Sequence, residues 1–160
     1  VSKGAFFHHF PTKQSVFLEL LENWLQGLDE QLDMVRAQAA SIPEALSQMA
    51  KIAPMILQNA SGKLPMFLEF WRRASQDEQV WKKVIAPYQR YRDFFATMIQ
   101  EGIDEGSLQG ISADVAARLL VALSVGLILQ GVLETEGVDW GQVTNQSIDI
   151  LLKGLARSNT

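Results

Sequence analysis

Apolar side chains recur every three or four positions along nearly the whole chain. No run alternates apolar with polar residues over a useful length. The first spacing is typical of amphipathic α-helices, whereas alternation would indicate strands. The pattern therefore predicts an all-α protein, a helical bundle. We expect helices over about 12–39, 41–59, 64–75, 77–102, 112–135 and 139–157.

Turn and capping residues set the expected boundaries of these helices. The expected N-caps are Ser41, Asp77, Ser112 and Asp139. Ser41 is followed three residues later by Glu44, which is the spacing of a capping box. Pro54 should kink or shorten the second helix, because it lacks the N–H that a helix interior needs. Gly102 and Gly106 are candidates for positive φ in the turn that follows 77–102.

The helix expected over 112–135 has no polar face. Its polar residues Arg118, Ser124 and Gln130 point in three different directions around the helix axis. A helix that is apolar all round must be buried on all sides. A membrane span is the rival interpretation, but the stretch from Leu119 to Leu129 is short against the ~20 residues that a bilayer needs. We therefore expect no membrane partner.

A chain of this length has difficulty burying both sides of such a helix. The last helix adds a second apolar stripe, so two helices from each of two chains would form a four-helix interface. The pattern thus predicts a homodimer. The residues expected at or near the interface are Leu119, Leu120, Leu123, Leu127, Ile148, Leu151, Leu152 and Leu155.

Residues 1–13 combine two Lys, two His and three Phe with no carboxylate. We interpret them as the end of a helix-turn-helix, because a recognition helix offers small or polar residues to base edges and cationic groups to phosphates. The first group is Ser2, Lys3, Gly4 and Ala5, and the second is His8, His9, Thr12 and Lys13. The alternative is an amphipathic helix whose Phe residues are core. The paired His residues point about 100° apart and have no Cys to join them, so we expect no metal site.

The same stretch, Val-Ser-Lys-Gly-Ala-Phe-Phe-His-His-Phe-Pro-Thr-Lys-Gln, is similar to the most recognisable segment of the TetR family of bacterial transcriptional repressors. The family pattern is Gly-Val-Ser-x-Gly-Thr-Leu-Tyr-x-His/Tyr-Phe-x-Ser/Thr-Lys, and the match runs without gaps from Val1 to about Val16. The sequence departs from it at Phe7, where the family's Tyr hydroxyl would touch DNA. The resemblance implies dimerisation through the last two helices and a ligand site in the body. Given this resemblance, the residues expected to contact base edges are Ser2, Lys3, Ala5 and Phe7.

The charge distribution agrees with a DNA-reading end on an acidic body. The net charge of the 160 residues is −4, and the two Lys of 1–13 leave −6 on the rest. An acidic body binds DNA poorly, so the basic surface should lie at the N-terminal end. A recognition helix also needs supporting helices, and we expect two more before residue 1. The chain has no Cys and no apolar leader, which fits a cytoplasmic location.

Eight of the fourteen aromatic residues lie between Phe67 and Phe95, and several Met residues join them. An adaptable apolar volume of this kind is typical of small-molecule pockets, although the same residues would also fill a core. The expected pocket lining is Trp24, Met55, Phe67, Phe70, Trp71, Tyr88, Tyr91 and Phe95, with Arg92 and Gln130 as polar anchors.

No nucleophile elbow, phosphate-binding Gly loop or Ser/His/Asp arrangement is present in the sequence, so we expect no enzyme and no cofactor. The expected domains are 1–38, the remnant of the helix-turn-helix with its connecting helix, and 39–160, the effector-binding and dimerisation domain. The expected function is a repressor that a small apolar or amphipathic ligand releases from operator DNA. The alternative is a helical dimeric carrier or sensor of a lipid-like ligand that binds no DNA.

Overall fold

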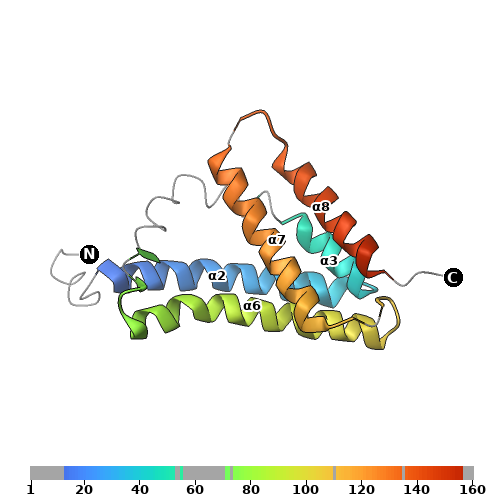
Figure 1. Cartoon of the computed structure of the whole chain (residues 1–160), viewed down its shortest axis with the longest axis horizontal. Helices are drawn as coiled ribbons and strands as arrows, with labels where there is room; N and C mark the ends of the chain where they lie inside the picture. Colours follow the sequence, from blue (N-terminus) through green and yellow to red (C-terminus); the bar gives the residue numbers. More distant parts are fainter. Residues whose placement is uncertain are drawn as a thin grey trace.

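The computed structural model describes residues 13–52, 55, 71–72, 74–109, 111–134 and 136–156. Its helices are α2 (Lys13–Gln38), α3 (Ile42–Ala50), α6 (Glu78–Asp104), α7 (Ala113–Leu133) and α8 (Trp140–Leu155). Figure 1 shows α2 and α6 side by side, with α7 and α8 rising from them as a hairpin. The described residues hold no strand, and the all-α prediction is confirmed.

Side-chain caps fix the starts of four helices where the sequence predicted them. The caps are Ser41, Asp77, Ser112 and Asp139, and each accepts from a backbone N–H of its own first turn. Glu44 reaches back as a capping box requires, but its carboxylate accepts from Ala40, one residue before the cap, at 3.0 Å. The helix that Ser41 starts ends at Ala50, well before the expected 59. The helix expected over 64–75 falls mostly outside the described residues.

The main core lies where α3, α6, α7 and α8 meet the second half of α2. Met98 and Ile99 of α6 are fully buried there, beside the small residues Ala116 and Ala117 of α7. Small side chains at that point let α6 and α7 approach closely, and α3 packs on α8 from the other side. This core holds the C-terminal half of α2 through Leu32.

α7 buries one face against this core and leaves the opposite apolar face uncovered. Among the described residues it is the one helix long and apolar enough to cross a membrane, with 28% of its apolar window buried. Core helices of soluble proteins meet the same length and composition criteria, so this is weak evidence for a membrane. The sequence predicted that α7 is buried on all sides. Within the chain, one side of α7 is buried and the opposite side is exposed.

Gly102 lies inside α6 and not in the turn that the sequence predicted. The positive φ falls at Gly106, with a value of 80°. Gly102 is instead a close-packing position, because a Cβ there would lie 2.7 Å from Leu108 Cδ1 and 3.1 Å from Ile42 Cβ. The glycine therefore allows the turn after α6 to fold back onto the helix.

Replacing Gly102 by Ala should lower the stability of the protein. Overpacking of this kind costs about 1–3 kcal/mol, against ~1 kcal/mol regained from helix propensity. Gly27→Ala in α2 is the matched control, because a Cβ at Gly27 meets nothing within 4 Å. That variant should gain about 0.4–1 kcal/mol. Urea unfolding of both variants checks this, and equal stabilisation would show that the packing at Gly102 is loose.

Candidate functional site

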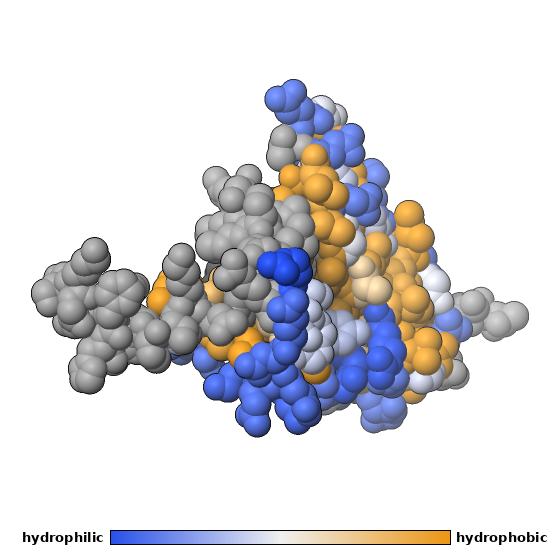
Figure 2. Space-filling view, turned by 60° about the vertical axis from the view of Figure 1, so that its left-hand side comes forward, coloured by the Kyte–Doolittle hydropathy of each residue, from blue (hydrophilic) through white to orange (hydrophobic). Residues whose placement is uncertain are grey.

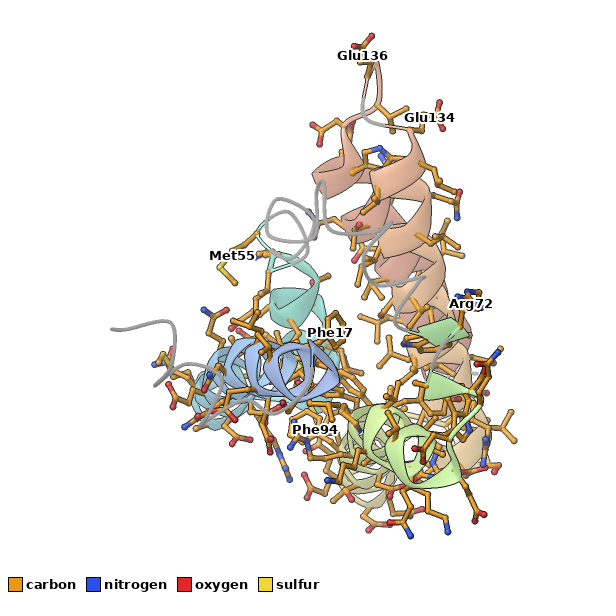
Figure 3. The ribbon with its side chains drawn as sticks, turned by 90° about the vertical axis from the view of Figure 1, so that its left-hand side faces the viewer. Phe17, Met55, Arg72, Phe94, Glu134 and Glu136 are labelled. Carbon is orange, nitrogen blue, oxygen red and sulfur yellow. The ribbon has the colours of Figure 1, made fainter. Side chains whose placement is uncertain are left out.

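α2 and α6 run parallel and are bridged at three levels along their lengths (Figure 1). Near the helix starts, Phe17 and Leu18 of α2 pack with the apolar cluster around Val84. In the middle, Asp29 joins Arg90 and Tyr91. Near the ends, Arg36 pairs with Glu101. Figure 3 looks along α2 and shows Phe17 and Phe94 between the two helices.

The middle bridge uses both carboxylate oxygens of Asp29. The Tyr91 hydroxyl donates to Oδ1 at 2.7 Å, and Arg90 Nη2 lies 2.9 Å from Oδ2. The Arg90 guanidinium also lies 5.5 Å from the Tyr91 ring centroid, which is within the range of a cation–π contact. Burial raises the pKa of the Tyr91 hydroxyl and its hydrogen bond to Asp29 raises it further, so Tyr91 remains a neutral donor.

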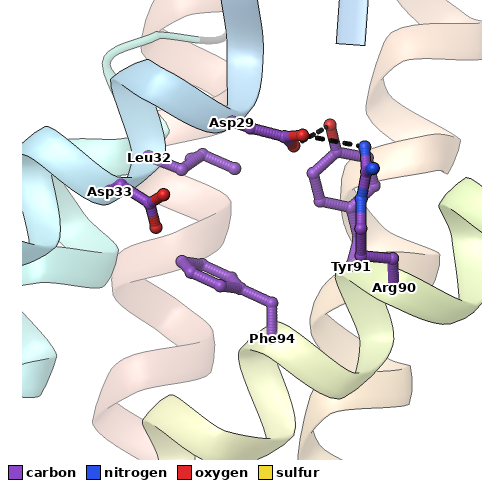
Figure 4. Close-up of a pocket in the computed structure, with 6 residues that line it drawn as sticks. All are labelled: Asp29, Leu32, Asp33, Arg90, Tyr91 and Phe94. Atoms are coloured by element: carbon purple, nitrogen blue, oxygen red, sulfur yellow. Dashed lines mark hydrogen bonds and ion pairs between the residues drawn. The ribbon is translucent and has the colours of Figure 1, made fainter. Parts of the chain in front are cut away.

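A cavity of about 180 Å³ opens beside this bridge (Figure 4). It is lined by Asp29, Leu32 and Asp33 from α2, and by Arg90, Tyr91 and Phe94 from α6. Its volume is below the ~300–1,000 Å³ of pockets for drug-sized ligands. The described residues can therefore enclose a small molecule of a few heavy atoms at this point. Among the same residues, no cluster of His, Cys, Asp or Glu could hold a metal ion.

Of the residues that the sequence predicted for a pocket, Tyr91 lines this cavity. Met55, Trp71 and Tyr88 are 39–45% exposed, and Figure 3 shows Met55 on the side of α2 away from α6. The other described members lie elsewhere: Phe95 against the main core, Arg92 paired with its neighbour Asp93, and Gln130 bonded to Gly126 of its own helix. The side chains of Trp24, Phe67 and Phe70 lie outside the described residues.

The sequence interpretation missed five of the six lining residues. On α2, Asp29 and Asp33 are one turn apart and flank Leu32. On α6, Arg90 and Phe94 are one turn apart and flank Tyr91. Each of these two groups of neighbouring charged and apolar residues could be seen in the sequence. Nothing in the sequence showed that the group on α2 would face the group on α6.

The predicted DNA contacts lie almost entirely outside the described residues. These are Ser2, Lys3, Ala5, Phe7, His8, His9 and Thr12. Lys13 opens α2, but its side chain also lies outside them. The helix that continues from the motif is the one that borders the cavity. One continuous helix therefore runs from the predicted DNA-reading motif to the cavity.

The predicted interface residues divide between the two sides of α7 and α8. Leu120, Leu127, Ile148 and Leu155 are buried in the chain's own core, and Leu123, Leu151 and Leu152 are half-buried against it. Leu119 is 53% exposed. The outward apolar residues, called here the α7 stripe, are Val115, Leu119, Ala122, Val125, Leu129 and Leu133. Figure 2 shows apolar surface along the α7–α8 hairpin, and Ile150 of α8 is also 70% exposed.

Several solved structures with the same fold are described as regulators. One from Saccharomonospora viridis, described as a transcriptional regulator in complex with choline, has 20% identity and a TM-score of 0.80, covering 98% of this chain and 82% of that one. A TetR transcription regulator from Haloarcula marismortui has 17% identity and a TM-score of 0.80, covering 98% and 81%. FadR from Bacillus subtilis, in complex with stearoyl-CoA, has 15% identity and a TM-score of 0.77, covering 97% and 83%. Curated protein sequences give no match.

The helical body, with the motif that leads into α2, is that of a TetR-family transcriptional regulator, and the chain belongs to this family. Within it, residues 57–155 match the model for the C-terminal part of BetI-type transcriptional repressors. The resemblance of residues 1–14 and the match of 57–155 rest on different parts of the chain, so they support the family independently.

Proposed function

We propose that the protein is a transcriptional repressor that binds operator DNA as a homodimer and is released when a small molecule binds in its body. The observation that carries the proposal is that the DNA-reading motif leads directly into α2, and α2 borders the cavity. Residues 1–38 would then read DNA and connect to the body, and 39–160 would bind the second protomer and, with the α2 residues that line the cavity, the effector. This role involves no catalysis, and for a bacterial DNA-binding regulator it implies the cytoplasm.

The α7 stripe supports the dimer. Its members recur at intervals of three or four residues on the face opposite to the core. Exposed apolar surface of that regularity marks an interaction site on a soluble protein. Packed against its own copy about a two-fold axis, the stripe would give two recognition helices for the two half-sites of a palindromic operator.

The effector would act by shifting the population of dimer conformations. A ligand that fits one spacing of the recognition helices better than the DNA-bound spacing lowers DNA affinity by that difference in binding free energy. The solved relatives named above hold choline in one case and stearoyl-CoA in another. The fold therefore accepts both small polar and long apolar ligands. A small amphipathic effector suits the mixed lining of the cavity.

The experiment that tests the proposal is a titration of the full-length protein against DNA from upstream of its own gene. Random DNA is the control, and several salt concentrations separate phosphate contacts from base contacts. Saturable binding at least a hundredfold tighter than to random DNA, reversed by a small molecule, is the expected result. Equal affinity for both DNAs across neighbouring promoters would contradict it and favour a carrier that binds no DNA.

Within that assay, Lys3→Ala and Lys13→Ala should act differently. Lys3 is predicted to contact base edges, so its loss should relax sequence preference by about 1–3 kcal/mol. Lys13 is predicted to contact phosphates, so its loss should weaken binding to specific and random DNA alike and flatten the salt dependence by about one unit of slope. Identical effects of the two variants on both DNAs would overturn these roles.

A further inference from the structure

The turn after α6, residues 105–109, carries groups that cap the ends of three helices. At the end of α6, the N–H of Leu108 donates to the carbonyl of Gly102 at 2.9 Å. At the start of α3, the carboxylate of Glu105 accepts from the N–H of Ile42 at 3.1 Å. The backbone groups at a helix end have no partner inside their own helix, so each of these bonds pairs a group that the helix itself leaves open.

The third helix capped by this turn is α8, at its C-terminal end. The backbone N–H of Gln109 donates to the carbonyl of Leu155 at 2.9 Å, and its side-chain amide donates to the carbonyl of Gly154. Two of the last four carbonyls of α8 are therefore paired by one residue of another segment. Beyond them, Ala156 is extended and forms an antiparallel bridge with Leu108. Figure 1 shows the turn after α6 and the end of α8 at the same end of the molecule.

The two sides of this contact are held with different firmness. On the side of the turn, Leu108 is buried in the main core and packs directly over Gly102. On the side of α8, Leu155 is buried, but Gly154 before it and Ala156 after it are exposed. Backbone hydrogen bonds that face solvent and carry few buried contacts open more easily than those of the core. The turn is therefore the fixed side of the contact, and the end of α8 is the side that can move.

We propose that residues 105–109 form a latch on the C-terminal end of α8, which opens and closes locally while the rest of the chain stays folded. Leu108 is its anchor, and Gln109 is the arm that holds α8. One consequence rests on the proposed function: α8 belongs to the predicted dimer interface, so the dimer favours the closed latch. Ile150, which is 70% exposed, lies one turn before Gly154 on the same face of α8. A second protomer that covers Ile150 would therefore hold this end of α8 in place.

The test is native-state hydrogen exchange of the full-length protein, resolved to single amides and corrected for their intrinsic rates. Gln109→Glu keeps the size of the side chain but replaces its donor by a carboxylate at the negative end of the α8 dipole. The amides of residue 109 and Ala156 should then exchange about tenfold faster, while the amide of Leu108 keeps its rate. Gln109→Lys keeps a donor and adds a favourable charge, so these amides should exchange no faster than in the wild type.

Gln100→Ala is the matched control. Gln100 is an exposed glutamine of α6 whose side-chain amide donates to Asp104 of the same helix at 2.9 Å. Its replacement should leave the exchange rate of Ala156 unchanged. The proposal is overturned if Ala156 keeps its wild-type rate in Gln109→Glu. It is also overturned if Gln109→Glu speeds exchange throughout α6 and α7 by the same factor, because the contact then contributes to global stability alone.

Protein concentration separates the latch from the proposed dimer. Sedimentation gives the dimer dissociation constant, and the exchange of the wild type is then compared above and below that concentration. Slower exchange of Ala156 in the dimer is the expected result. If the protein dimerises but Ala156 exchanges equally fast at both concentrations, the dimer does not favour the closed latch and that part of the proposal is wrong. If no dimer forms, the proposed homodimer fails, and the Gln109 variants alone decide whether the latch exists.

Discussion

Leu119→Glu should convert the protein from a dimer into a monomer at micromolar concentration. Leu119 is the second residue of the α7 stripe, with Val115 one turn before it and Ala122 about one turn after it. In a two-fold interface the new carboxylates would be buried twice, and each buried unpaired charge costs several kcal/mol. A total of about 4 kcal/mol or more raises the dimer dissociation constant at least a thousandfold.

Sedimentation velocity at several protein concentrations measures this directly. Gln26→Glu adds the same charge at an exposed position of α2 and should leave the dimer intact. The α7 stripe is not the interface if Leu119→Glu still sediments as a dimer. A monomeric Leu119→Glu should also lose operator affinity, since one recognition helix reads only one half-site.

The two sides of α7 show how far the sequence could lead. The absence of a polar face correctly implied that one side of α7 packs inside the chain, and the partner of the other side stays a prediction. The sequence could not say which of two adjacent residues, Leu119 or Leu120, faces inward. That choice depends on α6, because the small side chains of Ala116 and Ala117 on α7 allow the two helices to pack closely. The leucines chosen on α7 therefore include both core-facing and outward-facing residues, and the predicted set leaves out outward residues such as Val115.

The cavity shows a second limit. Helix starts could be predicted because a cap such as Asp77 acts on N–H groups within three residues of it. The bridge from Asp29 to Tyr91 spans 62 residues and forms only because α2 and α6 align in parallel. On an isolated helix, Asp29 is one more surface carboxylate. Its role arises from the alignment of two helices, which the local pattern does not encode.

Ile99→Ala should produce one of the largest losses of stability that a side-chain deletion can cause among the described residues. Ile99 has no exposed surface and packs in the main core at the point where α6 meets α7. Removing its buried methyl and methylene groups costs about 2–5 kcal/mol, against a total of ~5–15 kcal/mol for a domain. Ile99→Val removes one methylene and should cost about 0.5–1.5 kcal/mol.

Urea unfolding at one fixed protein concentration is the measurement, because the stability of a dimer depends on concentration. A loss below 1 kcal/mol for Ile99→Ala would mean that the core repacks around the deletion.

The same variant also tests how α2 moves. The C-terminal half of α2 is held by the buried Leu32 beside this core, whereas its middle is held by the polar bridge of Asp29. A helix held by the main core at one end, and by an exchangeable ion pair and a small apolar cluster further along, can pivot about the end that lies in the main core. Ile99→Ala should therefore loosen the pivot itself, and the release of operator DNA by an effector should weaken in this variant even where the effector still binds.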